Sequence, residues 1–371
     1  MKNGRIRVLH VVFSLEPGGM ENGLVNVASR LNPDEFTLDV CCLTKSGEFA
    51  SRLPKQSKVE TLNKQPGFSW GTVFRLARTI SRLNPDIIHT HNLGPLMYSS
   101  LATLGGLTRP ILHGEHGLTA TNQTQSVYRF RFFYGSCKKV HTVSEGLRTL
   151  LIEHGLPRDK SVVILNGVDT TRFSPVPVET ARAKIGLPSA GPVLGIVGRF
   201  DRQKRHLIMI EAFERIATRW PTAQLVMVGD GGDIRDEVKA RARQSPVTDR
   251  IHLPGFQREP AGFYQAMDLL VSPSLHEGLS NAVLEAAACG VPALTHLACG
   301  NSEIITNGEN GRIADLETAD SLAVELEKIL SAPEQMRQMG AAVLRTVKER
   351  FSIDVMVENY ARLYRQLAGK S

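Results

Sequence analysis

Residues 192–231 have the sequence PVLGIVGRFDRQKRHLIMIEAFERIATRWPTAQLVMVGDG, which is the pattern of a strand, a helix and a second strand. The apolar runs 192–200 and 223–231 are short and continuous, and the stretch 206–220 between them is amphipathic. Continuous apolar strands joined by an amphipathic helix are typical of a parallel sheet that is covered on both faces. This segment therefore predicts the α/β class.

The same alternation extends in both directions along the chain. The sequence predicts later strands in RIHLPGF, DLLVSPS and PALTH, and earlier ones in IRVLHVVF, TLDVCCLT, DIIHTHN, PILHGEH, KVHTVS and SVVILNGV. A break at 170–191 that contains three prolines separates the two series. We therefore expect two doubly wound, Rossmann-like α/β domains, 1–175 and 176–350, that face each other across a cleft. The amphipathic helix at about 351–371 either closes the second domain or packs back on the first.

The composition limits the classes of protein to consider. With 371 residues, 42% of them hydrophobic and 22% charged, it is the composition of a soluble globular protein with two domains. The five cysteines are scattered without a CxxC pair, so we expect neither a disulfide scaffold nor a cysteine zinc site, and a reducing cytoplasm fits best. The apolar run 8–15 is too short to span a membrane and predicts a buried first strand rather than a signal peptide.

Positive charge is concentrated in the first half of the chain. Residues 1–150 contain 18 Lys and Arg against 10 Asp and Glu, and the whole chain has a net charge of +7. A basic half suits a phosphate-bearing substrate or an anionic membrane face; the alternative is a solvated surface without a partner. The aromatic and basic stretch 126–139 either rests on the inner face of the cytoplasmic membrane or is an ordinary helix with an aromatic core face. No nucleic-acid motif accompanies the charge, so nucleic acid is not an expected partner.

The segment HEGLSNAVLEAAACG, residues 276–290, combines a helix with two glutamates. Ser280 is the predicted N-cap and Gly290 the predicted stop, and the free N–H groups at the start of the helix favour a phosphate. Glu285 lies inside an apolar run, where an unpaired carboxylate is costly. A nucleotide sugar explains both carboxylates if Glu285 binds the ribose and Glu277 binds a transferred sugar. The alternative is a helix N-terminal glutamate and a buried glutamate paired with an arginine.

Two cations follow the first strand of the opening segment. Arg199 and Lys204 lie just beyond its apolar run, where they can clamp a diphosphate or belong to a solvated loop. Gly18 and Gly19 leave another strand and enter a helix, which suits close approach of a phosphate or an acceptor, or is a plain turn. The spacing is not GxGxxG and no P-loop is present, so neither dinucleotide redox chemistry nor a P-loop NTPase is expected.

Four histidines, His89, His91, His113 and His116, occur at two predicted strand ends of the first half. A zinc site is one interpretation, but no carboxylate or cysteine is placed to complete a convincing ligand set. Packing or hydrogen bonding at the strand ends is the alternative, so no metal is expected here.

The stretch HEGLSNAVLEAAACGVPAL resembles the E-x7-E signature of the family 4 (group 1) retaining glycosyltransferases, which have the GT-B fold. Other segments resemble motifs of that family, in the same order: EPGGMEN (16–22), PDIIHTHN (85–92), GEHG (114–117), VSEGL (143–147), NGVDTTRF (166–173), VGRFDRQK (197–204), VGDGGD (228–233), LPGF (253–256) and GNSEIITNGENGRI (300–313). Each motif is weak alone, and their common order is specific. The start, GGMENGLVN, is similar to the bacterial exopolysaccharide branch.

The resemblance implies a metal-independent, retaining glycosyltransferase without a cofactor. It would move a sugar from a nucleotide-diphosphate sugar to a hydroxyl of a lipid-linked or other glycan acceptor, in exopolysaccharide or cell-envelope synthesis. Asp230 and Asp233 then form a turn near the nucleotide rather than a metal-binding pair. The implied catalytic residues are Glu277, His116, Arg199 and Lys204, of which Arg199 and Lys204 bind the pyrophosphate and His116 contacts the sugar. The implied substrate-binding residues are Gly18, Gly19, Gly198, Gly229, Asp230, Gly255, Phe256, Gly278, Leu279, Ser280, Asn281 and Glu285.

Two other functions use the same features. A GT-B-fold sugar-nucleotide epimerase would convert the donor without an acceptor, and the E-x7-E region argues against it. A catalytically silent protein would only bind the sugar nucleotide beside another transferase, and the presence of Glu277, Glu285, Arg199 and Lys204 argues against that.

Overall fold

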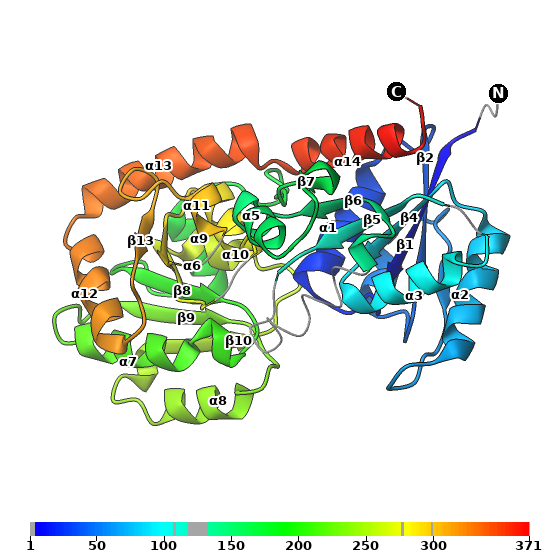
Figure 1. Cartoon of the computed structure of the whole chain (residues 1–371). Coiled ribbons are helices and arrows are strands. Elements are labelled where there is room, and N and C mark those ends of the chain that lie inside the picture. Colours follow the sequence, from blue (N-terminus) through cyan, green and yellow to red (C-terminus); the bar gives the residue numbers. More distant parts are fainter. Residues whose placement is uncertain (1–3, 107–108, 118–132, 276–277, 298–299, 371) are drawn as a thin grey trace. The chain divides into compact units, whose positions relative to one another are not determined.

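The computed structural model describes residues 4–106, 109–117, 133–275, 278–297 and 300–370 (Figure 1). The chain divides into two compact units, Met1–Gly167 with Ile353–Ser371, and Val168–Ser352. The strand order is β3-β2-β1-β4-β5-β6-β7 in the first unit and β10-β9-β8-β11-β12-β13 in the second. In each sheet the chain winds outward in both directions from a central pair of strands, β1 with β4 and β8 with β11. The predicted class, two doubly wound Rossmann-like α/β units, is confirmed.

All strand pairs of the first sheet are parallel. Successive residues of β4 and β5 are buried irrespective of the face to which they point, as expected for a parallel sheet covered on both sides. The N-terminal apolar run forms β1, so the prediction of a buried first strand is confirmed. The strands are β1 (Ile6–Val12), β2 (Phe36–Cys42), β3 (Val59–Thr61), β4 (Ile87–His91), β5 (Ile111–Glu115), β6 (Cys137–Thr142) and β7 (Ser161–Val163).

Among the helices of the first unit, α2 follows the apolar periodicity of the sequence most clearly and α3 does not. WGTVFRLARTISRL forms α2 (Trp70–Leu83), where the Ser69 hydroxyl accepts the Thr72 N–H at 3.2 Å as N-cap. The sequence did not predict α3, because its run LGPLMYSSLAT is apolar on all sides and has no helical period. The other helices are α1 (Gly19–Arg30), α3 (Leu93–Thr103) and α5 (Glu145–Glu153), with short 3-10 turns at Glu48–Arg52 and Arg158–Lys160.

The last helix, α14 (Ile353–Leu367), belongs to the first unit although it ends the chain. Its apolar face, which includes Tyr360 and Tyr364, shares one hydrophobic core with α1 and with β1. Arg365 fixes its outer side through two hydrogen bonds to Glu35, at 2.6 and 2.8 Å. In Figure 1 this helix is red and lies beside the blue strands of the first sheet. Residues from both ends of the sequence therefore line the same interior.

The second unit repeats the doubly wound pattern with six parallel strands. The opening segment forms β8, α7 and β9 in the predicted order. The strands are β8 (Val193–Val197), β9 (Gln224–Val228), β10 (Ile251–Gly255), β11 (Leu269–Ser272), β12 (Ala293–His296) and β13 (Arg312–Ala314). The helices are α6 (Val178–Ile185), α7 (His206–Ile216), α8 (Arg235–Arg243), α9 (Ala261–Ala266), α10 (Asn281–Ala288), α11 (Asn301–Ile304), α12 (Ala319–Leu330) and α13 (Pro333–Arg350), with 3-10 turns at Arg202–Lys204 and Thr248–Arg250.

The break predicted at 170–191 contains a helix, α6, that is part of the second unit. Pro177 occupies its N-cap and Gly186, with a φ of 72°, its C-cap, which explains the turn-like composition. The reason that it folds is burial of Arg182, whose guanidinium pairs with Asp268 at 2.5 Å. That partner is distant in the sequence, so local composition did not reveal the helix.

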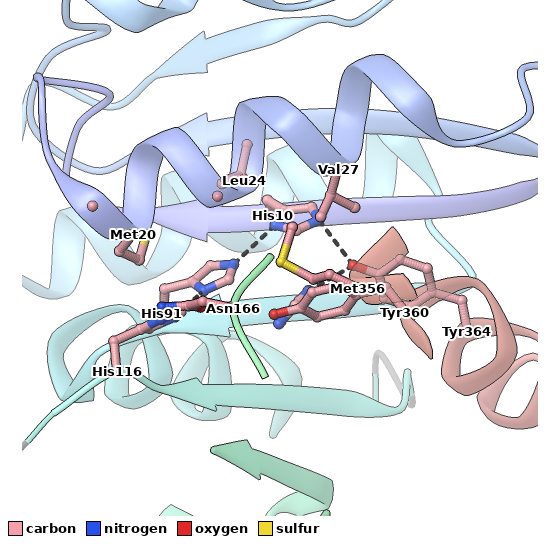
Figure 2. Close-up of a pocket in the computed structure, with 13 residues that line it drawn as sticks. His10, Met20, Leu24, Val27, His91, His116, Asn166, Met356, Tyr360 and Tyr364 are labelled. Atoms are coloured by element: carbon pink, nitrogen blue, oxygen red, sulfur yellow. Dashed lines mark hydrogen bonds between the residues drawn. The ribbon is translucent and has the colours of Figure 1, made fainter. Parts of the chain in front are cut away.

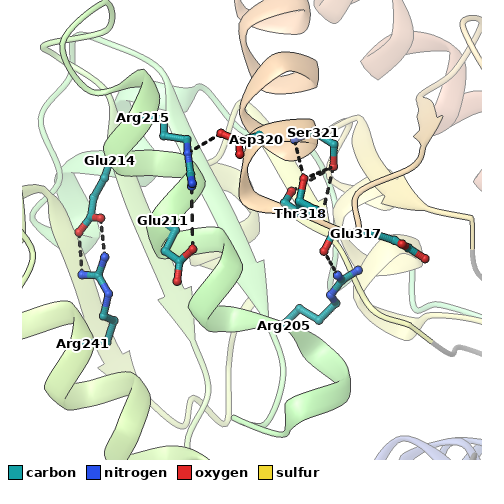
Figure 3. Close-up of polar contacts among 9 residues, drawn as sticks. All are labelled: Arg205, Glu211, Glu214, Arg215, Arg241, Glu317, Thr318, Asp320 and Ser321. Atoms are coloured by element: carbon teal, nitrogen blue, oxygen red, sulfur yellow. Dashed lines mark hydrogen bonds and ion pairs between the residues drawn. The ribbon is translucent and has the colours of Figure 1, made fainter.

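Polar contacts on the outside of the second unit fix its helices to one another (Figure 3). Glu214 of α7 accepts two hydrogen bonds from Arg241 of α8, at 2.7 and 2.5 Å. Arg215 pairs with Asp320 at 2.8 Å, at the start of α12. Such bidentate arginine–carboxylate pairs add direction to packing that is otherwise hydrophobic. These contacts thus join α7 to α8 and to α12.

Two further findings bear on the sequence predictions. The four cysteines among the described residues, Cys41, Cys42, Cys137 and Cys289, are buried free thiols. Within the described parts of the chain, no helix combines the length and the apolar character that crossing a bilayer requires.

Candidate active site

Three predicted glycines meet at the carboxyl ends of β8, β9 and β10. The Gly198 N–H donates to the Val228 carbonyl at 2.9 Å, and the Gly229 N–H donates to the Gly255 carbonyl at 3.0 Å. Gly198 and Gly229 have φ angles of 153° and 146°, and a β-carbon on Gly229 would lie 1.9 Å from the Gly198 oxygen. Only glycine fits there, so this edge of the sheet presents bare backbone to a ligand.

Lys204 and Arg199 lie on the loop that leaves this glycine row. Lys204 ends the short 3-10 turn Arg202–Lys204, and its methylene groups pass over Gly198, with Cε 3.6 Å from the position of a β-carbon there. The Arg199 side chain is 71% exposed and pairs with Asp201 at 2.9 Å. The structure therefore brings together Gly198, Lys204, Gly229 and Gly255, and it places Arg199 on the same loop.

The loop that leads to the E-x7-E helix begins beside the Lys204 turn. The Leu275 N–H donates to the Gln203 carbonyl at 3.0 Å, which joins the loops after β11 and β8. These two strands are the central pair of the sheet, where ligands of doubly wound folds bind. On the other side, a β-carbon on Gly300 would lie 1.7 Å from the Gly278 oxygen, so the loop after β12 also touches this segment. Glu277 lies outside the described residues.

Helix α10 begins after the predicted N-cap residue. Ser280 occupies the N-cap position as predicted, but its side chain makes no capping hydrogen bond. The hydroxyl is buried rather than turned over the amide groups of the first turn. Gly290 has a φ of 79° just beyond the C-cap Cys289 and ends the helix as predicted. A ligand at the N-terminus of α10, where Leu279 and Asn281 also lie, would thus not compete with the Ser280 hydroxyl.

Glu285 is half-buried among residues of α10 whose side chains are fully buried. Desolvation raises the pKa of its carboxyl to about 7, although the Tyr264 hydroxyl and the charge of Arg172 both act to lower it. Among the residues that the structure describes, no cation forms an ion pair with Glu285, and Arg172 pairs with Glu259 instead, at 3.0 Å. The structural alternative, a glutamate paired with an arginine, therefore finds no support.

Asp230 forms ion pairs with basic side chains of its own unit. It pairs with Arg235 at 2.5 Å and with Lys239 at 3.2 Å, and the Arg235 hydrogen bond holds the pKa of this carboxyl well below its usual range. Asp233 accepts the Arg202 N–H at 3.0 Å. Both carboxylates thus fix the turn after β9. Phe256, just beyond Gly255, has an exposed ring, with 53% of its surface accessible.

In the first unit, Gly18 and Gly19 form the start of α1. Gly18 is the N-cap residue in extended conformation, and Gly19 is the first helical residue. The carboxylate of Glu21 lies against Gly18, because a β-carbon there would be 2.3 Å from its Oε2 atom. Both glycines follow β1, one of the two central strands, so the predicted glycine loop lies at the switch point of the first sheet.

The histidines of the first unit form a hydrogen-bonded chain, part of which is drawn in Figure 2 with His10, His91, His116 and Tyr364 labelled. It links six residues end to end in the order His116, His91, His10, Tyr364, His89, His141. The distances are 2.9 Å for His116 Nε2 to His91 Nδ1, 2.9 Å for His91 Nε2 to His10 Nδ1, 3.2 Å for His10 Nε2 to the Tyr364 hydroxyl, 2.8 Å for that hydroxyl to His89 Nδ1, and 2.9 Å for His89 Nε2 to His141 Nε2. Five of its six members, all except His141, line a cavity of about 20 Å³, room for about one water molecule, together with Gly19 and Asn166.

Sequence reasoning found three members of this chain and missed the others. His10 was taken only as part of an apolar run, and His141 and Tyr364 were not considered as site residues. The available signal was position, because His10 and His141 lie in strands whose carboxyl ends meet His89 and His91 at one edge. His113, which the sequence grouped with them, instead pairs with Thr90 at 2.9 Å and with Glu115 at 3.4 Å.

Two groups among the described residues bring three metal-ligand atoms close together, His10 with His89 and His91, and His296 with Asp315 and Glu317. In the first group the ring nitrogens are already paired with one another, with Tyr364, with His116 or with His141, so a metal ion would have to displace these hydrogen bonds. In the second group the two carboxylates are exposed. Neither group contains a residue that we predicted to bind the donor.

The segment 126–139, one candidate for a membrane contact, is described only from residue 133. Residues 126–132 lie outside the described part, so the membrane and core-face interpretations are not compared there. Tyr134 is buried against His113, with ring centroids 5.8 Å apart, and Lys138 and Lys139 lie in β6.

Comparison with known proteins extends over most of the chain. Residues 17–172 match the model of Glycosyltransferase Family 4, and residues 177–345 match that of Glycosyl transferases group 1. A lipopolysaccharide core biosynthesis glycosyltransferase, LpsE, of Rhizobium meliloti is 30% identical over 54% of this chain, which is 56% of its own length. The UDP-Gal:alpha-D-GlcNAc-diphosphoundecaprenol alpha-1,3-galactosyltransferase of Escherichia coli is 25% identical over 88% of each chain.

The fold comparison agrees. The crystal structure of Anabaena HepE in complex with UDP-glucose superposes with a TM-score of 0.85 over 98% of this chain and 100% of that one, at 20% sequence identity. Both halves of the sequence match one family, and both sheets have the topology of its fold. The chain belongs to the group 1 glycosyltransferases of the GT-B fold.

Proposed function

We propose that this glycosyltransferase moves a sugar from a nucleotide-diphosphate sugar to a hydroxyl acceptor, with retention of the anomeric configuration and without a metal ion. One observation carries the proposal. The row of bare backbone at Gly198, Gly229 and Gly255 adjoins a loop with two cations, Arg199 and Lys204, at the carboxyl edge of the second sheet. Backbone that a ligand can approach closely, with cations beside it, suits a diphosphate.

In the proposed reaction the bond between the anomeric carbon and the phosphate oxygen breaks, and a bond to the acceptor oxygen forms on the same face. The acceptor proton leaves with the departing diphosphate. Arg199, Lys204 and the start of α10 near Gly278–Asn281 stabilise the charge that develops on that diphosphate, which is electrostatic catalysis. His116 and Glu277 orient the sugar, and Glu285 accepts hydrogen bonds from the ribose hydroxyls. Gly18 and Gly19 allow close approach of a phosphate or an acceptor at the first sheet.

The relatives suggest which substrates to test first. The name of the Escherichia coli relative specifies a UDP-linked galactose and a diphosphoundecaprenol acceptor, and HepE was solved with UDP-glucose. We therefore propose a UDP-sugar donor, a lipid-linked or other glycan acceptor, and a role in cell-envelope or exopolysaccharide synthesis.

The decisive experiment follows nucleotide release from UDP-, GDP-, ADP- and dTDP-sugars with and without a cell-envelope acceptor extract. Thermal shift identifies the donor beforehand, because a bound ligand stabilises the folded chain by mass action. A transferase releases nucleotide diphosphate only with an acceptor, apart from slow hydrolysis, and NMR of the product shows an anomer unchanged from the donor. Conversion of the donor alone would indicate an epimerase, and binding without turnover a silent protein. Full activity of folded Glu277→Ala would refute the role of that carboxylate.

The same proposal includes contact with an anionic membrane, for which α2 provides the surface. Three aromatic side chains, Phe68, Trp70 and Phe74, are 50%, 60% and 65% exposed at and before the start of this helix. The helix carries three arginines and neither aspartate nor glutamate. Exposed aromatic rings beside cations are the composition of a surface that lies at a lipid headgroup layer.

Vesicle binding tests this surface. A variant with Trp70→Ser and Phe74→Ser should lose most of the binding of the wild-type chain to phosphatidylglycerol vesicles, and binding to phosphatidylcholine vesicles should be weak throughout. Val324→Ser, which changes a side chain 51% exposed on α12 of the second unit, is the matched control and should bind as the wild type does. Equal binding of the double variant and the control would refute the assignment of α2.

A further inference from the structure

Each of the six members of the hydrogen-bonded chain in the first unit has one N–H or O–H proton available for a hydrogen bond. Burial lowers the pKa of His10 and His116 to about 3, and holds the pKa values of His89, His91 and His141 well below the ordinary one. Each imidazole is therefore neutral and carries a single N–H. Burial raises the pKa of the Tyr364 hydroxyl well above its usual value, so the phenol keeps its proton. Six groups thus share six protons across five hydrogen bonds.

Only two proton arrangements satisfy all five bonds. Each internal histidine uses one nitrogen toward each neighbour, and the Tyr364 hydroxyl must donate to one histidine and accept from the other. If His141 donates from Nε2, then His89, His10, His91 and His116 must all carry the proton on Nδ1. If His116 instead donates from Nε2, these same four rings all carry it on Nε2 and His141 carries it on Nδ1. Any mixed pattern leaves two donors or two acceptors facing each other at one of the five contacts, and that contact is then not a hydrogen bond.

We propose that the chain holds His116 in one tautomer through Tyr364, so that Tyr364 is a positioning residue for the group that faces the donor sugar. The free nitrogen of the His116 ring, Nδ1, is then a defined donor or a defined acceptor rather than a mixture of both. This matters because a histidine that orients a sugar hydroxyl must present one hydrogen-bonding character in every turnover. The inference rests on the proposed contact between His116 and the sugar for its consequence, and on geometry alone for the tautomer pattern.

The two ends of this hydrogen-bonded chain, His116 and His141, have different surroundings. His116 is half-buried and lines the cavity, where a ligand or water can reach it. At the other end, His141 Nδ1 is buried and has no hydrogen-bond partner among the described residues. An unpaired buried N–H is rarer than an unpaired lone pair, so this end favours the arrangement in which His141 is protonated on Nε2 and His116 on Nδ1. The link to α14 is Tyr364, the only one of these six groups that a helix supplies; His116 lies just beyond β5 and the other four histidines lie in strands.

Nuclear magnetic resonance of the full chain, with 15N-labelled histidine, tests the pattern directly, because two-bond couplings identify the protonated nitrogen of each ring. Single histidine substitutions assign the signals. We expect His10, His89, His91 and His116 to be protonated on the same kind of nitrogen and His141 on the other. Any of the four with the opposite tautomer would overturn the proposal, and so would a charged ring at pH 7. This measurement needs neither activity nor a ligand.

Tyr364→Phe tests the role of the phenol, and Tyr360→Phe is the matched control. Both tyrosines are buried on α14 and both line the cavity, but the hydroxyl of Tyr360 is not a member of the chain. In Tyr364→Phe we expect His116 to become a mixture of tautomers and kcat to fall about tenfold, with the donor KM within a factor of two. The control should retain one tautomer and wild-type kcat. A single His116 tautomer in folded Tyr364→Phe would overturn the proposal.

The two proposals fail in different ways. If no sugar donor supports transfer, the tautomers measured in the wild-type protein still show whether the protons of the six hydrogen-bonded groups are ordered. If transfer occurs and the four rings do not share one tautomer, the proposed function stands and the inference about Tyr364 is wrong.

Discussion

The carboxyl edges of the two sheets have the same topology and opposite chemistry. Around the central strands β1 and β4, the edge is filled with neutral imidazoles that hydrogen-bond one another, and the last link comes from α14. Around β8 and β11, the edge is bare glycine backbone next to charged loops, with Lys204 lying over Gly198. A doubly wound sheet fixes where a site lies, and the residues at that point decide what it binds.

The difference also concerns how each edge is held in place. The histidine edge is held by side-chain hydrogen bonds in a buried interior, where each bond depends on the protonation of the next. The glycine edge is held by backbone hydrogen bonds and by contacts too close for any side chain. We therefore expect substitutions at the first edge to alter function through protonation, and substitutions at the second edge to act through charge or through steric conflict.

The largest effect is expected from Lys204→Met, which keeps the methylene packing over Gly198 and removes the charge. Because loss of one preorganised charge at a developing anion costs about 10²–10³-fold in rate, kcat should fall by about that factor. Lys184→Met, at an exposed position of α6, is the control and should leave kcat unchanged. Steady-state kinetics with the identified donor measures both variants. Wild-type kcat in folded Lys204→Met would remove the proposed distinction between the two edges.

A smaller effect, on stability, is expected from Gly229→Ala. The new methyl group would lie 1.9 Å from the Gly198 oxygen at a φ of 146°, so the variant should lose about 3 kcal/mol of unfolding free energy. Gly231→Ala has a φ of 70° and no atom within 4 Å of the new methyl group, so about 1 kcal/mol is expected from backbone strain alone. Urea denaturation compares them. Equal stability of the two variants would show that the glycine row is not close-packed.

Glu285→Gln should give the smallest effect, and it should depend on pH. Burial raises the pKa of Glu285 from 4.5 to about 7, so the cost that this carboxyl adds to folding grows between pH 4.5 and pH 7, is complete above pH 7 and is absent below about pH 4.5. Glutamine cannot ionise, and the variant should therefore be more stable than the wild type by about 2 kcal/mol at pH 8 and equal to it at pH 4.5. Nucleotide binding should weaken about tenfold because a charged acceptor for the ribose hydroxyls is lost.

Thermal denaturation at pH 8 and at pH 4.5, with titration calorimetry of the nucleotide, measures both effects. A residue kept for structure would destabilise the chain when replaced. Loss of stability at pH 8 together with unchanged nucleotide affinity would thus favour the structural interpretation of Glu285.

The local pattern of the sequence was sufficient for much of the site. The strand–helix–strand segment at 192–231 located Gly198, Lys204 and Gly229 at strand ends, because a strand end in a parallel sheet is visible as the end of an apolar run. The N-cap position of Ser280 in α10 was predicted correctly, but the absence of its capping hydrogen bond was not, since burial of this side chain depends on the residues around it. The helix α6 was missed for a similar reason, because Arg182 is buried against Asp268.

By itself the sequence determined the α/β class, the two doubly wound units and the ordered motifs of a glycosyltransferase, because periodicity and glycine spacing are local properties. Tertiary structure alone decided that His10, His91 and His116 form one chain with Tyr364. These residues come from two strands, from the loop after a third and from the last helix, up to 354 positions apart. Hydrogen bonds at 2.8–3.2 Å depend on the register of neighbouring strands and on the docking of α14, which no single stretch of sequence encodes.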